Sequence, residues 1–155
     1  RDRPGRERRV DVIELGRRGP GVAWALIFRT DDEVISLLRE HARRAGLRAA
    51  HFRALGAFRT ARLAFFDWET KRYEEIPVAE QVEVTSLTGD VAMNDGEPAI
   101  HVHCVLGRRD GSAITGHLME GIVRPTLELF LTGYDAELPR RHDEESGLPL
   151  IRRGA

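Results

Sequence analysis

Strand-like segments follow one another from Ala49 to the end of the chain, and they constrain the fold more than any other feature. Bulky apolar residues recur with a period of two, and glycine or aspartate interrupts the pattern at turn-like positions. In order, the segments are AAHFRAL, ARLAFFD, the hairpin DWETKRYEEI, QVEVTSLTGDVAM, AIHVHCVL, SAITGHLM and RPTLELFLT. Strands connected mostly by hairpins imply a largely antiparallel sheet.

One segment before this region has the pattern of a helix, over residues 31 to about 45. Thr30-Asp31-Asp32-Glu33 matches the capping-box pattern of a helix start. The apolar residues of the segment fall on one helical face, and they are Val34, Leu37, Leu38 and Ala42. Gly46 stands where a helix commonly ends. We therefore expect one amphipathic helix.

The remaining segments lie at the two ends of the chain. Val10 to Leu15 alternates weakly and is interpreted as an edge strand, and GVAWALIFR, from Gly21, as a further strand. DAELPRRHDEESG is interpreted as a polar loop that leads to a short apolar end, LPLI. One helix with about seven or eight strands predicts an α+β fold with a mainly antiparallel sheet.

Length and composition indicate one globular domain. The 155 residues are 41% apolar and 32% charged, and the net charge is −1. We expect a single domain over residues 10–153, preceded at 1–9 by a flexible arm with five arginines and two acidic residues. No apolar run approaches the roughly 18 residues of a membrane span, and no segment resembles a signal peptide. Because Cys104 is the single cysteine, an internal disulfide is excluded, and we expect a cytoplasmic protein.

The segment AIHVHCVL places two histidines side by side. Period-two alternation puts His101 and His103 on one face of the strand, about 6.6 Å apart along the backbone. The other face is wholly apolar and must be packed; it carries Ile100, Val102, Cys104 and Leu106. Cys104 is therefore interpreted as a small core residue rather than a nucleophile.

The loop that follows decides whether His117 joins this pair. A two-residue turn at Asp110-Gly111 would set Cys104 opposite His117 and point the third imidazole away. A three-residue loop, Arg109-Asp110-Gly111, instead sets His103 opposite His117, and glycine suits the left-handed position of this common hairpin. Facing Cβ atoms then lie roughly 4.5–5.5 Å apart, so both imidazoles can reach one ion.

Three converging imidazoles predict a metal centre in the hairpin of residues 99–119. Three neutral histidine ligands with a fourth position left to water describe an open zinc site. Imidazole also suits nickel, copper and iron, so another divalent transition metal is an alternative. A second alternative is a solvated sheet face with three polar residues. His51 and His142 have no such partners in the sequence, and His41 is interpreted as a residue on the helix surface or near its end.

Much of the chain resembles the plants-and-prokaryotes-conserved (PPC) domain. The resemblance is carried by GAFRTARLAFFDWETKRY, VEVTSLTGDVAMNDGEPAIHVHCVLGRRDGSAITGHL, EGIVRPTLELFL and RRHDEESGLPLI. It implies a mainly antiparallel sheet, assembly as a homotrimer, and a metal site at the His-x-His and Gly-His-Leu histidines, here His101, His103 and His117. Thr115 stands where the family usually has the first glycine of a Gly-Gly-His.

The resemblance also implies a DNA-binding or regulatory protein. Plant members carry AT-hooks centred on Arg-Gly-Arg-Pro, whereas this chain has Arg1-Asp2-Arg3-Pro4, and a carboxylate fits the negative minor groove poorly. The plant partner motif ends in Phe-Glu-Ile-Leu, and its counterpart here is Val82-Glu83-Val84-Thr85. A trimer would bring three arginine-rich arms together, which adds avidity for DNA.

Two other functions stay open. The fold is similar to that of acetolactate decarboxylase, so a metal enzyme acting on a small carbonyl or carboxylate is an alternative, with a small-molecule anion at the metal. Its candidate residues, none assigned a catalytic role, are Glu83, Glu120 and Glu128 as acid or base and Arg53 and Arg124 as anion anchors. The other alternative is a structural trimer in which the metal ties down the hairpin and has a closed fourth ligand, either a carboxylate or Cys104, although Cys104 faces the wrong way.

Overall fold

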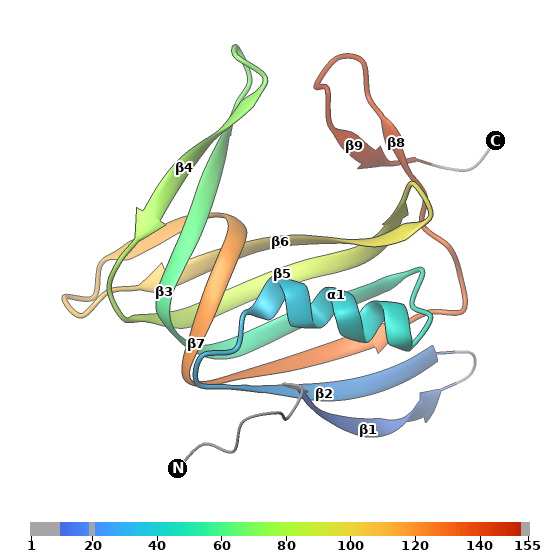
Figure 1. Ribbon diagram of the computed structural model, residues 1–155, viewed down its shortest axis with the longest axis horizontal. Helices are drawn as coiled ribbons and strands as arrows, with labels where there is room; N and C mark the ends of the chain where they lie inside the picture. Colours follow the sequence, from blue (N-terminus) through green and yellow to red (C-terminus); the bar gives the residue numbers. More distant parts are fainter. Residues whose placement is uncertain (1–9, 19–20, 153–155) are drawn as a thin grey trace, which may run out of the picture.

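Seven strands with alternating apolar residues form one antiparallel sheet in the computed structural model, which describes residues 10–18 and 21–152 (Figure 1). Its order is β1-β2-β7-β6-β5-β3-β4. The bounds are β1 (Asp11–Arg18), β2 (Gly21–Arg29), β3 (Ala50–Asp67), β4 (Arg72–Val78), β5 (Val82–Asn94), β6 (Glu97–Gly107) and β7 (Ala113–Gly133). The predicted α+β class with a mainly antiparallel sheet is confirmed. The arm predicted at 1–9 lies outside the described residues.

Two strands are longer than the sequence predicted. AAHFRAL and ARLAFFD form the single strand β3, and SAITGHLM and RPTLELFLT form the single strand β7. Shifts of register, rather than turns, absorb the bends. At one shift, Gly56 has a φ of 152°, and a Cβ there would lie 2.2 Å from the carbonyl oxygen of Thr126. Glycine therefore allows β3 and β7 to cross in close contact.

These long strands close a circuit of pairings. β3 pairs with β5 and also with β7, and β7 pairs with β6 and with β2. Because β5 pairs with β6, the four strands β3, β5, β6 and β7 hydrogen-bond to one another in a ring. The ring holds β6 and the first half of β7, which carry the three clustered histidines, in one fixed relation.

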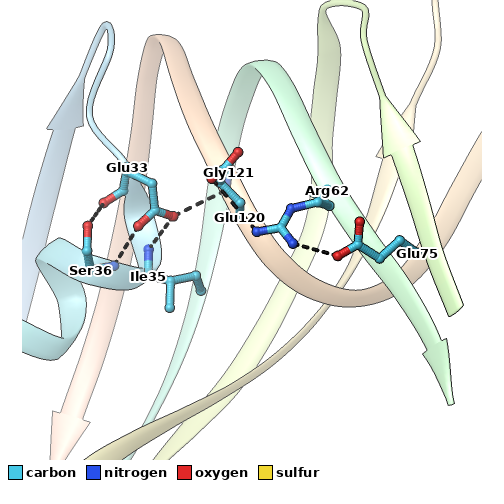
Figure 2. A network of polar contacts seen from close by, with 7 residues as sticks. All are labelled: Glu33, Ile35, Ser36, Arg62, Glu75, Glu120 and Gly121. Atoms are coloured by element: carbon cyan, nitrogen blue, oxygen red, sulfur yellow. Dashed lines mark hydrogen bonds and ion pairs between the residues drawn. The ribbon is translucent and has the colours of Figure 1, made fainter. Parts of the chain in front are cut away.

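The helix α1 (Val34–Arg44) begins later than the capping-box pattern indicated. The backbone N–H of Asp31 donates to Val123 at 2.9 Å, and the N–H of Val123 donates to Asp32 at 3.0 Å, so these residues pair with β7 instead of starting a helix. Glu33 is the actual N-cap, and its carboxylate accepts from the N–H groups of Ile35 and Ser36 (Figure 2). The prediction that Thr30 starts a capping box is therefore wrong.

The helix packs on one face of the sheet, and the other face is largely exposed. Val34, Ile35, Leu38 and Ala42 of α1 join a core cluster with the apolar residues of the strands. The outer face carries exposed apolar side chains, among them Ile13, Leu55 and Phe130. The same alternation thus separates a packed inner face from an outer face that is available for ligands. In the described chain, α1 is too short and too polar to cross a membrane.

The polar segment near the C-terminus contains a hairpin and is not a simple loop. β8 (Arg140–His142) and β9 (Pro149–Ile151) form a separate two-stranded sheet. Its turn is held by Asp143, whose carboxylate accepts from the N–H of Ser146 at 3.0 Å and from its hydroxyl at 2.7 Å. The β8–β9 and β3–β4 hairpins project from the same side of the sheet (Figure 1).

Candidate metal centre

The alternation predicted for β6 is confirmed. Val102, Cys104 and Leu106 are at most 3% exposed and belong to the core. His101 and His103 lie on the opposite, outer face, where His101 is half-buried and His103 is exposed. Burial raises the pKa of the Cys104 thiol to about 12. Its side chain packs in the core, on the face of β6 opposite the histidines.

The loop between β6 and β7 has the predicted register. His103 is paired directly with His117 across the two strands. The N–H of Arg108 donates to Ser112 at 2.8 Å, which leaves three residues in the loop, and Gly111 has a φ of 83°. Gly116 allows β7 to lie close against β3, since a Cβ at this position would lie 2.9 Å from the carbonyl oxygen of Ala64 on β3. β7 therefore presents His117 between β6 and β3.

The three imidazoles converge. Their ring centroids are 5.0, 5.3 and 5.4 Å apart, and one nitrogen from each ring lies within 4.8 Å of the other two. Nε2 of His101 and Nε2 of His103 are 3.2 Å apart. Nδ1 of His117 is buried and has no hydrogen-bond partner among the described residues. A polar atom of this kind is usually satisfied by a water molecule or an ion, so the donor set fits a metal.

The surroundings of His103 and His117 keep these two rings in the neutral form that binds metals. Burial, followed by the charges of His101 and His103, lowers the pKa of His117 to about 4. Burial and the charge of His101 also lower the pKa of His103. A metal ligand must be a neutral imidazole, so at pH 7 neither ring has to lose a proton before binding.

A carboxylate behind His101 was not anticipated from the sequence. Asp90 is the direct partner of His101 on β5, and its Oδ2 lies 3.5 Å from Nδ1 of that ring. Burial acts to raise the Asp90 pKa, but the hydrogen bond from His101 and the charge of Arg140 outweigh it and lower the pKa. The signal for Asp90 was present: a two-residue turn at Asp95-Gly96 fixes the β5–β6 register.

Two further residues approach the cluster from the projecting hairpins, and sequence patterns did not indicate them. The ring of Tyr73 on β4 packs against His117 with centroids 4.9 Å apart. Arg140 on β8 forms an ion pair with Asp90, and its side chain is only 8% exposed. Both contacts depend on tertiary packing between distant segments.

The candidate acid, base and anchor residues are not gathered at the histidines. Glu120 lies 3.9 Å from the guanidinium of Arg62, which also binds Glu75 (Figure 2). Arg124 donates to the side-chain oxygen of Gln81 at 3.0 Å. Glu83 pairs with Gly107 at the end of β6 remote from His101, and Glu128 pairs with Leu55. Arg53 is the exception. It pairs with Thr88 on β5, which pairs with His103 on β6, so one residue separates Arg53 from His103 across the sheet.

The other histidines lie apart from the cluster. His51 is hydrogen-bonded through Nδ1 to the hydroxyl of Tyr134 at 2.7 Å. His142 is exposed and lies 3.8 Å from Glu144. His41 lies in the last turn of α1 and packs edge-on against Trp24, and burial lowers its pKa. Its position near the helix end is as predicted, but it is half-buried and not a surface residue.

The arrangement of the sheet and its histidines agrees with a match to a known family. A model of the Plants and Prokaryotes Conserved (PCC) domain, abbreviated PPC above, matches residues 17–135. The chain belongs to this family. None of the curated proteins matches the chain by sequence.

Three solved structures are similar to most of the chain. A metal-containing protein from Archaeoglobus fulgidus is 30% identical, with 95% of this chain and 100% of that chain covered and a TM-score of 0.80. A PPC protein from Pyrococcus horikoshii is 26% identical, with 94% and 96% covered and a TM-score of 0.81. A Ralstonia eutropha protein described as a "putative DNA-binding protein" is 26% identical, with 84% and 91% covered and a TM-score of 0.80.

A more distant similarity concerns the enzyme alternative. A Staphylococcus aureus protein of unknown function, described as similar to alpha-acetolactate decarboxylase, is 9% identical with a TM-score of 0.52. The match covers 72% of this chain and 52% of that chain. At this identity the similarity shows a shared fold alone.

Proposed function

We propose that this PPC-domain protein binds one divalent transition metal through His101, His103 and His117, and that zinc is the metal that suits these ligands best. The observation that carries the proposal is the convergence of three ring nitrogens within 4.8 Å of one another. The buried, unpartnered Nδ1 of His117 and the lowered pKa values of His103 and His117 support it. The metal-containing relative from Archaeoglobus fulgidus supports it as well.

The site is proposed to be open on its outer side. The cluster supplies three ligands, Cys104 faces the core, and Asp90 lies behind His101 at Nδ1. A zinc ion with three histidine ligands can polarise a bound carboxylate or lower the pKa of a bound water to about 7. The histidines hold the ion, and Asp90 orients the His101 ring.

The test is metal content, measured by mass spectrometry on protein purified without a histidine tag. We expect close to one zinc per chain in the wild type and a large loss in His103→Ala. His51→Ala is the matched control, because His51 lies on the same face but is bonded to Tyr134. Absence of metal from the wild type, even after incubation with zinc, would refute the proposal.

The metal protein is further proposed to be a cytoplasmic regulator that binds DNA. Support comes from family membership and from the Ralstonia eutropha relative. The described surface gives less support for DNA binding, because many of its arginines are already paired with carboxylates. These arginines are Arg29, Arg43, Arg44, Arg48, Arg59, Arg62, Arg108 and Arg152. Binding should therefore depend on the arginine-rich residues 1–9. Removing them should abolish salt-dependent DNA binding, and retained binding would contradict this role.

A homotrimer is proposed from the resemblance, with the part of the outer face around three exposed apolar residues as its contact surface. Ile13, Leu55 and Phe130 are 51%, 60% and 46% exposed there, and apolar exposure of this kind is typical of an assembly surface. Light scattering should give three times the 17.5 kDa chain mass. Phe130→Arg should shift the mass toward the monomer, and a monomeric wild type would contradict the assembly.

An enzyme acting on a small carbonyl or carboxylate is the second candidate. The observation that favours it is Arg53, whose charge stands in one row with His103 on the open face. Small 2-oxo and 2-hydroxy acids should be screened for turnover by the zinc-loaded protein. Turnover that is lost in Arg53→Gln would support the enzyme, and no turnover of any acid would count against it.

A further inference from the structure

Arg140 is a buried charge that is not itself one of the proposed metal ligands. It lies on β8, outside the residues 17–135 that the family model matches. Its guanidinium forms an ion pair with Asp90 and donates to the carbonyl oxygen of Pro149 on β9 at 3.2 Å. Its side chain is 8% exposed, whereas most paired arginines of the described surface are 37–72% exposed. A charge buried to this extent needs a specific partner, and Asp90 is that partner.

The β8–β9 hairpin is anchored to the sheet next to Asp90. The N–H of Met93 on β5 donates to the carbonyl of Leu138 at 2.8 Å, and Met93 also forms a bridge with Pro139. At the other end of the hairpin, the N–H of Arg152 donates to Pro139 at 3.0 Å. The backbone thus brings Arg140 to the strand that carries Asp90, three residues before Met93.

Asp90 divides its two oxygens between Arg140 and the histidine cluster. Oδ1 is paired with the Arg140 guanidinium, and Oδ2 lies 3.5 Å from Nδ1 of His101. The other nitrogen of this ring, Nε2, lies 3.2 Å from Nε2 of His103. A carboxylate at one ring nitrogen fixes the tautomer and orientation of an imidazole and leaves the other nitrogen free to bind a metal.

We propose that Arg140 is a positioning residue of the metal centre, so that docking of the β8–β9 hairpin and metal binding are coupled. The inference rests on the proposed metal function and adds its regulation by the C-terminal hairpin. Arg140 holds Asp90, and Asp90 holds His101 with Nε2 toward the other imidazoles. Coupling is reciprocal: a docked hairpin raises the affinity for zinc, and bound zinc keeps the hairpin docked.

The first part of the test is zinc affinity, measured by competition with a chromophoric chelator. Asp90→Asn and Arg140→Gln should each weaken binding by about 10- to 100-fold, the range found for residues that orient histidine ligands. The double variant should bind no more weakly than Asp90→Asn alone, because Arg140 acts through Asp90. Arg141→Gln, an exposed neighbour on β8, is the control and should bind as the wild type does.

The second part is hydrogen exchange of backbone amides in the wild type, with and without zinc. Zinc should slow exchange in residues 140–151, and this protection should be lost in Asp90→Asn. Two results would overturn the coupling but not the proposed metal site. One is a wild type that binds zinc with unchanged hydrogen exchange in the hairpin, and the other is an Arg140→Gln variant that binds zinc with wild-type affinity. Wild type that binds no zinc would overturn the metal proposal and the coupling with it.

Discussion

His51 and the cluster of His101, His103 and His117 share the outer face of the sheet, yet their surroundings differ. His51 on β3 pairs with Asp90 on β5, which pairs with His101 on β6. His51 uses its Nδ1 in a hydrogen bond with Tyr134, whereas Nδ1 of His117 in the cluster is buried without a partner among the described residues. His51 and His117 carry the same imidazole ring, but Nδ1 has a hydrogen-bond partner in His51 and none among the described residues in His117.

Together with the convergence of the three rings, this difference is the basis for proposing a ligand site at the cluster and a structural contact at His51. A histidine bonded to a neighbouring hydroxyl has a complete local environment and gains little from an ion. Three imidazoles that face one another gain a shared partner only when an ion or water enters. The following predictions test the distinction, in order of decreasing expected effect.

Replacing His117 should have the largest effect. At a free zinc concentration of about 100 times Kd, binding should stabilise the wild-type fold by about 2.7 kcal/mol. His117→Ala should lose this zinc-dependent gain, because one ligand is missing. His51→Ala should keep it. The measurement is the melting temperature of each protein with and without zinc, and an equal gain in His117→Ala would show that the cluster is not the site.

Acid should destabilise the metal-free protein through the same residue. The folded pKa of His117 is about 4, below the ordinary value of 6.5, so between these pH values the unfolded chain binds more protons. Stability contributed by neutral His117 is therefore present above pH 6.5 and is lost as pH falls toward 4. The unfolding free energy should be measured by denaturant melts at several pH values in this window, for the metal-free wild type and for His117→Gln. It should fall more steeply with decreasing pH in the wild type. The same pH dependence in both proteins would contradict the lowered pKa.

Cys104 should behave as part of the core although it is next to His103. With a pKa of about 12, the thiol should react with a thiol-specific reagent only after unfolding. Cys104→Ala should cost about 1 kcal/mol in stability and leave the zinc content unchanged. Rapid labelling of the folded protein, or loss of zinc in the variant, would mean that the two faces of β6 are not separated.

Tyr134→Phe should have the smallest effect. It removes one hydrogen bond to His51 at an exposed position, and we expect a loss of about 0.5–1 kcal/mol in unfolding free energy. Zinc content should stay at the wild-type value. A change in zinc affinity would connect His51 with the three-histidine cluster and remove the distinction between them.

The sequence predicted most of the sheet and the histidine pairing because both depend on local patterns. Alternation in β6 placed His101 and His103, and the loop ending in Gly111 set His103 against His117. The same reasoning applied to Asp95-Gly96 would have found Asp90. In each case, a turn of known geometry fixes the partner of a residue a few positions away.

The features that were missed depend on contacts between distant segments. The capping-box pattern at Thr30 competes with the pairing of Asp31 and Asp32 to β7, and the pairing prevails. Arg140 reaches Asp90 only because the β8–β9 hairpin docks on β5, a contact between residues 50 positions apart. No local periodicity reports such a contact.

The ring of pairings among β3, β5, β6 and β7 has a consequence for the order of folding. The β6–β7 pair that carries the histidines is closed by a short loop, whereas β3 must find β7 across the whole intervening chain. Local contacts form at a small entropic cost and distant ones at a larger cost, so folds rich in distant pairings fold slowly. We therefore expect the histidine hairpin to form early and the final closure of β3 on β7 to limit the rate. A zinc ion present during folding would then meet its ligands before the sheet that holds them is complete.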